Sequence, residues 1–445
     1  MRFQELKEIL FKLAQNAGLT EYDVYYRMTE DQSAEAVNNQ PNSCSSGTSG
    51  GICFRCVVDG KLGSASTQYL EKNKLEALVK NAMDNAALIE NEEAPIFFEG
   101  APAQAYRTLK CEMPDFPGVA ELRRITMALQ AQMYAATPMM TDGTCSAAGA
   151  TRVSVAYANS KGVELSHAFG TVTTYVEPVI HDGKEPSFGS AMAQSLATDT
   201  DIVKQATDEA IARLGATTVK TGKYDVIFDR RRVRSLLGAY SSIFSGKAAL
   251  QGLSLLKGKE GEQIASEKLT LVDDPFYEEN PVKCAFDAEG VPTKEKTLIE
   301  RGVLKTLLYD LTNARKAGVE TTGNAARGYA DPVSVAPYCL RIEAGEETRE
   351  EMIARMGNGL FVTEMKGLHA GANAVTGDFS IESAGFLVEN GKLTRPVHSF
   401  TVAGNFFELL KAVDGVASNV EMGAPGRSAI AAPDVLVRGL SVAGE

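Results

Sequence analysis

The sequence lacks both a membrane-spanning run and an excess of positive charge. No window of the 445 residues reaches the roughly 18 consecutive apolar residues that a transmembrane helix needs. Basic residues number 45 against 57 acidic ones, so the net charge is −12. An acidic chain is a poor match for the phosphate backbone of nucleic acids. We therefore expect no membrane insertion and no direct nucleic-acid binding.

Cysteine is scarce, and only one pair lies close together in the sequence. The seven cysteines are Cys44, Cys53, Cys56, Cys111, Cys145, Cys284 and Cys339. An odd number scattered through a long chain favours free thiols over disulfides. The close pair, Cys53 and Cys56, lies in Gly51–Val58, a segment typical of a β-strand that ends at the Asp59-Gly60 turn. We expect ordinary strand residues, and a thiol hydrolase or redox protein that uses this pair stays an alternative.

Locally recognisable catalytic motifs are also missing. The sequence contains no P-loop and no G-x-S-x-G elbow, and none of its four histidines belongs to a His-Glu-x-x-His zinc motif. The histidines are His167, His181, His369 and His398. His369 stands out because it lies in a loop of small residues, Gly367–Asn373. The basic run Arg230–Arg234 opens a predicted helix, where a solvated face or an acidic partner surface is the expected role.

The composition that is present belongs to a soluble globular protein. Hydrophobic residues make up 44% and charged residues 23% of the chain, as in ordinary globular domains. Residues 1–18 place apolar side chains at helical spacing with lysine and glutamate between them. This pattern predicts an amphipathic helix rather than the continuous apolar core of a signal peptide, and we expect a cytoplasmic protein.

The pattern of elements predicts an α+β fold with three regions. An α/β region covers residues 1–100, a linker covers 101–118, a middle α/β region covers 119–215, and a C-terminal domain covers 222–445. In the first region, Asn38–Gly51 is crowded with serine, glycine and proline, which predicts a flexible loop. The C-terminal domain contains several hairpin signals, of which Asn390-Gly391 is the strongest. We therefore expect this domain to be β-rich and mainly antiparallel.

Three stretches of the C-terminal half together resemble the TldD/TldE family, whose TldE members are also called PmbA and labelled "modulator of DNA gyrase". They are Gly323–Tyr329 with the Asp331-Pro-Val-Ser-Val segment after it, Gly371–Ser380 leading into the Asn390–Pro396 hairpin, and Thr401–Phe406. Each motif alone is weak, but their order and spacing make the combination specific. The resemblance extends over nearly the whole chain.

The resemblance implies a heterodimeric peptidase that degrades or trims peptides and unfolded segments. TldD-type subunits carry a zinc motif, His-Glu-x-x-x-His, on the helix after the first strand of the C-terminal domain. Here that helix is predicted at Arg232–Phe244, and the motif would fall near Leu237–Ser242, which contains neither histidine nor glutamate. Zinc needs imidazole, thiolate or carboxylate ligands and a base for its bound water. The resemblance therefore points to the TldE type, which has no catalytic or metal-binding residues and no cofactor of its own.

Partners and candidate contact residues also follow from the resemblance. We expect a TldD-like partner that carries the zinc, a homodimer when the chain is alone, and a peptide as substrate. The candidate contacts with substrate or partner are Tyr240, Gly323, Asn324, Arg327, His369, Gly377 and Asp378. The glycines would allow the backbone to approach a peptide or the partner closely. A role in tight turns explains the presence of these glycines equally well. Modulation of DNA gyrase by protein–protein contact is the other alternative function.

Overall fold

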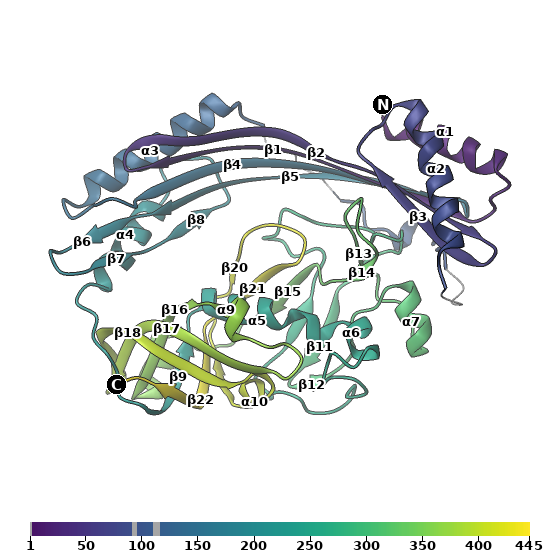
Figure 1. The fold of residues 1–445 in the computed structure, drawn as a ribbon. Coiled ribbons are helices and arrows are strands. Elements are labelled where there is room, and N and C mark those ends of the chain that lie inside the picture. Colours follow the sequence, from purple (N-terminus) through teal and green to yellow (C-terminus); the bar gives the residue numbers. More distant parts are fainter. Residues whose placement is uncertain (1, 91–95, 110–115) are drawn as a thin grey trace.

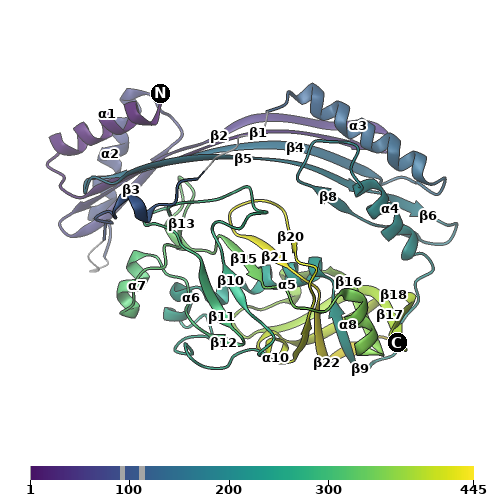
Figure 2. The ribbon, with the colours of Figure 1, turned by 180° about the vertical axis from the view of Figure 1, so that it is seen from behind.

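The computed structural model describes residues 2–90, 96–109 and 116–445, and in it a long curved sheet arches over a second, β-rich body (Figure 1). The same arch is seen from behind in Figure 2. Strand accounts for 39% of the residues and helix for 25%, which confirms the α+β class. None of the helices in the described residues is long and apolar enough to cross a membrane.

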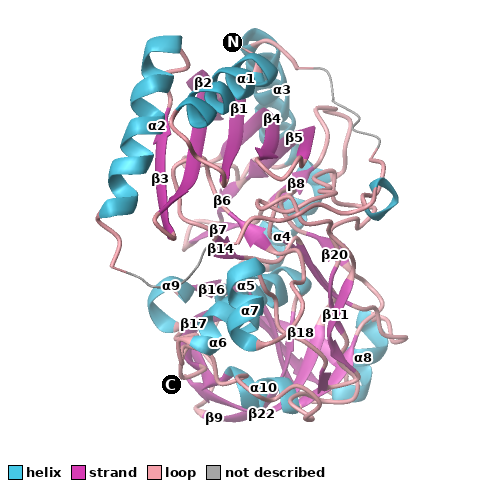
Figure 3. Cartoon of the chain, turned by 90° about the vertical axis from the view of Figure 1, so that its right-hand side faces the viewer, coloured by secondary structure: helices cyan, strands magenta, loops and turns pink. Residues whose placement is uncertain are grey.

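The long sheet joins strands from the first and the middle regions of the chain. Its six strands are ordered β3-β2-β1-β4-β5-β8, and all pairings are antiparallel (Figure 3). The strands are β1 (Tyr22–Val37), β2 (Gln40–Val58), β3 (Lys61–Thr67), β4 (Cys145–Asn159), β5 (Glu164–Glu177) and β8 (Ala191–Ala193). Because β1 pairs with both β2 and β4, the two regions share a single sheet.

Helices cover the long sheet at its two ends. Apolar side chains of α1 (Phe3–Asn16) and α2 (Lys72–Ala87) form one core with β1 and β2. At the other end, α3 (Val119–Ala136) and α4 (Ile202–Ala212) form a separate core with β4 and β5 (Figure 1). Short elements complete these regions: η1 (Ala103–Ala105), β6 (Val179–His181) and β7 (Pro186–Phe188).

The C-terminal body contains two six-stranded sheets around the largest core. The first has the order β18-β17-β16-β9-β22-β19 and the second β12-β11-β10-β15-β21-β20. The first sheet comprises β9 (Gly222–Phe228), β16 (Gly359–Lys366), β17 (Asp378–Glu389), β18 (Lys392–Asn405), β19 (Val413–Val416) and β22 (Val435–Ala443). The second comprises β10 (Leu271–Asp273), β11 (Lys296–Glu300), β12 (Val303–Leu304), β15 (Cys339–Ile342), β20 (Glu421–Met422) and β21 (Ala429–Ala432). Most pairings are antiparallel, which confirms the expected β-rich C-terminal domain.

Helices and one short ribbon fill the rest of the C-terminal body. They are α5 (Arg230–Tyr240), η2 (Ser241–Phe244), α6 (Gly246–Leu250), α7 (Leu311–Ala317), α8 (Arg349–Met356), α9 (Leu368–Gly371), α10 (Phe406–Lys411), β13 (Ala325–Ala326) and β14 (Ser334–Val335). The helix predicted at Arg232–Phe244 is thus α5 and η2 together. It begins at Arg230 because the Asp229 side chain accepts a hydrogen bond from the backbone N–H of Arg231 and caps the helix.

The flexible loop predicted at Asn38–Gly51 is wrong, because β2 runs through it. Asn38 and Asn39 form the tight turn between β1 and β2, and both have positive φ angles of 52° and 58°. This turn sets β2 in register with β1 along its whole length, with one bulge at Glu35/Ala36. Serine and glycine have little strand preference of their own, so the pairing with β1 holds the segment extended. Part of the predicted linker 101–118, residues 110–115, lies outside the described residues.

Candidate functional site

The surface of α5 is where the metal motif of the TldD type was expected. Leu237 points into the hydrophobic core, whereas Gly238 is exposed. A Cβ atom added at Gly238 would lie 3.4 Å from Cδ1 of Ile430 on β21. An apolar side chain therefore packs beside the position where a ligand would be needed. Within residues 2–90, 96–109 and 116–445, no group of three or more His, Cys, Asp or Glu side chains is arranged to hold a metal ion. The side chains at this position do not fit zinc.

Tyr240, at the end of α5, is committed to contacts inside the chain. Its hydroxyl donates a hydrogen bond to the backbone oxygen of Asp378 at 2.8 Å. Its ring stacks on Phe406 with 4.2 Å between the ring centroids and an angle of 5°. Burial raises the pKa of Tyr240 to about 12, so the hydroxyl keeps its proton at neutral pH. In this position the side chain fixes the start of β17 against α5.

Gly377 and Asp378 form the turn that receives this hydrogen bond. Gly377 has a φ of 84°, and an added Cβ would lie 2.6 Å from the ring of Phe407, so glycine is needed here. The Asp378 carboxylate accepts a hydrogen bond from Asn405 Nδ2 at 2.9 Å, and hydrogen bonds from Asn405 and Thr376 lower the pKa of Asp378. The Asp378 side chain is exposed, so it is accessible to another molecule.

His369 lies near this group on α9, which packs against α5. Its side chain is exposed. The structure thus gathers four of the seven candidate residues around the C-terminal end of α5: Tyr240, His369, Gly377 and Asp378.

The other three candidates form a separate group in the C-terminal body, and one of them, Arg327, reaches the long sheet. Asn324 is fully buried, and its Nδ2 atom donates to Asp273 Oδ2 at 2.8 Å and to the Ala336 carbonyl at 3.0 Å. Gly323 has a φ of 68°, and an added Cβ would lie 2.7 Å from the Pro292 oxygen. Both residues therefore shape the inside of the C-terminal body.

Arg327 connects the two bodies. Its Nη2 atom lies 3.5 Å from Asp23 Oδ2 on β1, and its guanidinium lies 4.5 Å from the centre of the Tyr25 ring. Tyr25 also donates its hydroxyl hydrogen to the Arg327 carbonyl at 3.2 Å. Asp23 is paired with Arg55 on β2 as well, through Nε at 3.0 Å. Since all these charged groups are buried, the ion pairs fix the orientation of the long sheet on the C-terminal body.

Two carboxylates of the C-terminal body lie beside this network. Glu289 is buried, and its Oε1 atom is 3.8 Å from Arg55 Nη1. Asp287 is buried too and accepts three backbone hydrogen bonds, from Glu289, Val291 and Ala325. Burial raises the pKa of both carboxyl groups, and the charge on Asp287 raises that of Glu289 further. This network carries charge that depends on pH.

Cys53 and Cys56 do not come together. They lie on opposite faces of β2, because residues three apart on a strand point in opposite directions. Burial raises the pKa of both thiols, that of Cys56 to about 11. A protonated, buried thiol is a poor nucleophile. The geometry therefore gives no support to a redox pair or thiol hydrolase at these residues.

A second thiol, that of Cys284, lies beside a histidine. Cys284 Sγ lies 3.9 Å from His167 Nε2, and the His167 ring packs on Phe286. Burial lowers the pKa of His167 to about 4, with Arg427 and Arg27 contributing. The cavity beside the pair has a volume of about 10 Å³, which is too small for a substrate.

Three of the four arginines at the start of α5, Arg230, Arg231 and Arg234, are paired within the chain. Arg230 and Arg234 both bind the Glu421 carboxylate on β20. Arg231 reaches across to the middle region, where its Nη2 atom lies 2.6 Å from Glu209 Oε1 on α4. These pairs hold β20 and α4 against α5.

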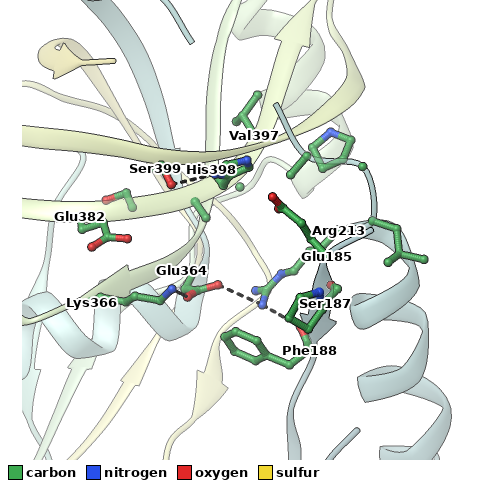
Figure 4. A pocket seen from close by; sticks show the side chains of 18 residues that line it. Glu185, Ser187, Phe188, Arg213, Glu364, Lys366, Glu382, Val397, His398 and Ser399 are labelled. Atoms are coloured by element: carbon green, nitrogen blue, oxygen red, sulfur yellow. Dashed lines mark hydrogen bonds and ion pairs between the residues drawn. The ribbon is translucent and has the colours of Figure 1, made fainter. Parts of the chain in front are cut away.

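A polar cleft of about 200 Å³ lies between β7, the end of α4 and the first sheet of the C-terminal body (Figure 4). Its charged side chains are Glu185, Arg213, Glu364, Lys366, Glu382 and His398. Glu364 is ion-paired with Arg213 at 3.3 Å and Lys366 at 3.0 Å. His398 Nδ1 lies 2.7 Å from Ser399 Oγ. Of these residues, the sequence singles out only His398, because the walls come from segments far apart in the chain that no local motif connects.

The comparisons with known proteins agree with this fold. Three family models match in order along the chain: PmbA/TldA metallopeptidase domain 1 at residues 22–86, the central domain at 113–214 and the C-terminal domain at 221–444. A crystal structure from Thermotoga maritima, of a proposed modulator of a DNA gyrase, superposes with a TM-score of 0.88 and 30% sequence identity. The match covers 99% of this chain and 100% of that one.

Curated relatives give the same family name. A metalloprotease of Methanothermobacter thermautotrophicus is 31% identical over 284 residues, which are 61% of each chain. Metalloprotease PmbA of Escherichia coli O157:H7 is 30% identical over 259 residues, or 58% of this chain and 54% of that one. These two matches thus span between half and two thirds of the relatives' length. The family models together with the full-length structural match show that the chain belongs to the PmbA/TldD metallopeptidase family.

Proposed function

We propose that this chain is the TldE/PmbA-like, non-catalytic subunit of a two-subunit zinc peptidase. A TldD-like partner carries the zinc and hydrolyses peptides or unfolded segments, and this chain completes the substrate chamber. Alone, it does not cleave peptides.

The proposal rests on one observation: on α5, the side chains at the position of the expected zinc motif cannot bind a metal. Peptide hydrolysis needs an activated water or nucleophile and stabilisation of the oxyanion. Leu237 is buried in the core, and Gly238 faces the apolar side chain of Ile430. Neither residue can bind a metal or take a proton, so this helix supplies neither group.

The exposed residues near α5 support a role in contact. His369 and Asp378 are exposed beside the buried Tyr240, and the neighbouring Val375 is an exposed apolar side chain. A peptide or a partner subunit would meet a mixed polar and apolar surface here, which is typical of interfaces.

Reconstitution tests the proposal. This chain and a homologue that contains His-Glu-x-x-x-His are purified separately and mixed, and cleavage of a flexible peptide is measured with each protein omitted in turn. We expect cleavage only in the mixture, and complete inhibition by a zinc chelator. Cleavage by this chain alone that a chelator does not inhibit would overturn the proposal.

Modulation of DNA gyrase is a second candidate, because the Thermotoga relative carries that name. The net charge of −12 argues against DNA as the target, so we infer a contact with the gyrase protein or an indirect effect through peptide cleavage. A supercoiling assay with purified gyrase distinguishes them: only a direct contact changes the rate without the zinc-bearing partner.

A further inference from the structure

The polar cleft of about 200 Å³ lies where the middle region meets the first sheet of the C-terminal body (Figure 4). Backbone hydrogen bonds hold its walls together: the Thr217 N–H donates to the Pro396 carbonyl at 3.1 Å, and the His398 N–H donates to the Thr217 carbonyl at 3.0 Å. Binding sites for small molecules are commonly preformed and lie at such junctions. The cleft is smaller than the roughly 300 Å³ at which drug-sized sites begin, so it suits a molecule of amino-acid or dipeptide size.

The two strongly basic side chains of the cleft are paired within the chain to different degrees. Arg213 donates to the Phe188 carbonyl at 3.0 Å and to Glu209 Oε1 at 2.7 Å. It also donates to Glu364 Oε2 at 3.3 Å, so its role is to hold the walls. Lys366 Nζ lies 3.0 Å from Glu364 Oε1, and 57% of the Lys366 side chain is exposed. Because an ammonium group has three hydrogens, Lys366 can still donate to a ligand.

Two carboxylates of the cleft have no cation beside them. No hydrogen bond or ion pair of the Glu185 or Glu382 side chain is found among the described residues. Glu382 lies directly opposite Lys366 in the pairing of β16 with β17, yet Lys366 forms its ion pair with Glu364. Glu185 directly precedes β7, so the two carboxylates reach the cleft from opposite walls (Figure 4). The cleft therefore contains two negative charges that a ligand could neutralise.

A bulge in β18 adds a histidine and a serine to the same cleft. His398 and Ser399 together lie opposite the single residue Ala384 of β17. Ser399 has a φ of 52°, which is uncommon for a residue other than glycine, and its Oγ lies 2.7 Å from His398 Nδ1. In the part of the chain that the structure describes, His398 Nε2 has no partner. Bulges and strained backbone of this kind are frequent beside binding sites, where they turn side chains toward a ligand.

We propose that the cleft binds a small molecule with an ammonium group next to a carbonyl or carboxylate, as in a free amino acid or at the N-terminus of a short peptide. The ammonium group matches the carboxylates of Glu185 and Glu382. The carbonyl or carboxylate accepts hydrogen bonds from Lys366 and from the His398–Ser399 pair. Within the described residues no three His, Cys, Asp or Glu side chains are arranged to hold a metal ion, so an organic cation is the better match. The inference concerns this chain alone and does not depend on the proposed peptidase role.

Isothermal titration calorimetry of the purified chain tests the class of ligand. The probes are alanine, alanyl-alanine, N-acetylalanine and ethylamine. We expect binding of alanine, which would identify a free amino acid, or of alanyl-alanine, which would identify a peptide N-terminus, or of both. N-acetylalanine lacks the ammonium group and ethylamine lacks the carbonyl, so each should bind at least about tenfold more weakly. No binding of alanine and alanyl-alanine at millimolar concentration would overturn the proposal, as would equally tight binding of N-acetylalanine or ethylamine.

A matched pair of substitutions on β17 tests the place of binding. Glu382→Gln removes one of the two carboxylate charges, and we expect the dissociation constant of the probe that binds to rise at least about tenfold. Glu389→Gln lies on the same strand but outside the cleft, and it should leave the constant within about threefold of wild type. Equal dissociation constants in the two variants would contradict binding in this cleft.

Ser399→Gly separates the backbone from the hydroxyl. Glycine adopts a φ of 52° without strain, so the free energy of unfolding in urea should change little. The substitution removes the hydroxyl beside His398 Nδ1, and we expect the same probe to bind at least about threefold more weakly. A residue that only shapes the bulge would leave binding unchanged, and that result would overturn the role proposed for the His398–Ser399 pair.

Discussion

At the scale of single residues, most polar side chains in the candidate groups form hydrogen bonds or ion pairs within the chain. Tyr240 donates to the Asp378 carbonyl, and Asn324 donates to Asp273. Arg327 is placed between Asp23 and the Tyr25 ring. Exposed groups free to meet another molecule are fewer, and His369 and Asp378 are the clearest. The proposed contact with a partner therefore rests on these two exposed side chains.

Tyr240→Phe tests whether the tyrosine hydroxyl stabilises the fold through its hydrogen bond to the Asp378 carbonyl. The substitution keeps the ring stacked on Phe406 but removes one of two donors to the Asp378 carbonyl, which still accepts a hydrogen bond from the Asn373 N–H at 2.9 Å. We expect the free energy of unfolding to fall by about 0.5–1.5 kcal/mol, measured by urea denaturation. Peptide cleavage by the reconstituted complex should change little. Unchanged stability together with a large loss of cleavage would instead indicate that the hydroxyl serves the substrate.

Glu289→Gln tests the charge beside the buried ion pairs that connect the long sheet to the C-terminal body. Burial and the charge on Asp287 raise the pKa of Glu289 in the folded state. The carboxyl group therefore stabilises the fold at pH values below its ordinary pKa of about 4.3, and this stabilisation is lost as the pH rises through the raised pKa. Glutamine stays neutral and can still accept the hydrogen bond from the Leu311 N–H. We expect the stability of the wild type to decline more steeply than that of the variant as pH rises from 4 upward. Parallel pH profiles of the unfolding free energy in the two proteins would contradict this.

At the scale of elements, local patterns predicted some segments well. The amphipathic helix predicted within residues 1–18 is α1, because its apolar side chains recur at helical spacing and Leu6, Leu10 and Ala14 are buried. The Asn390-Gly391 turn joins β17 and β18 as expected, since both residues adopt positive φ.

Other features could not be predicted, because they depend on contacts between distant segments. β2 is extended through Gln40–Gly50 only because β1 pairs with it, and serine-rich sequence gives no sign of that. Asn324 meets Asp273, and Arg327 meets Asp23, across large separations in the chain. The family motifs identified these residues as candidates but gave no indication that they lie in two separate groups. The cleft at Glu364 was missed for the same reason.

The capping box of α8 gives a prediction at this scale. The Thr348 side chain accepts a hydrogen bond from the Glu351 N–H, and the Glu351 carboxylate accepts one from the Thr348 N–H. Thr348→Ala should lower the free energy of unfolding by about 0.5–2 kcal/mol. Glu350→Ala, in the same turn but outside the box, is the control and should have a smaller effect in the same denaturation experiment. An equal effect of both substitutions would show that the box does not stabilise the helix.

At the scale of the whole molecule, two bodies are joined by buried ion pairs, and α5 carries Leu237 and Gly238 where the zinc motif of the TldD type was expected. The long sheet is fixed on the C-terminal body by buried ion pairs at one end and by the Arg231–Glu209 contact at the other. The proposed function differs from that of a self-sufficient metallopeptidase in assigning the zinc to a partner, and it rests on Leu237 and Gly238 of α5.

Metal analysis of the purified proteins tests this account most directly. The chain alone and its complex with a zinc-bearing homologue are each dialysed against zinc and then against buffer, and bound zinc is counted per polypeptide. We expect no tightly bound zinc on this chain alone and one zinc per complex, contributed by the homologue. One zinc held tightly by each copy of this chain alone, and lost on His369→Ala, would contradict it.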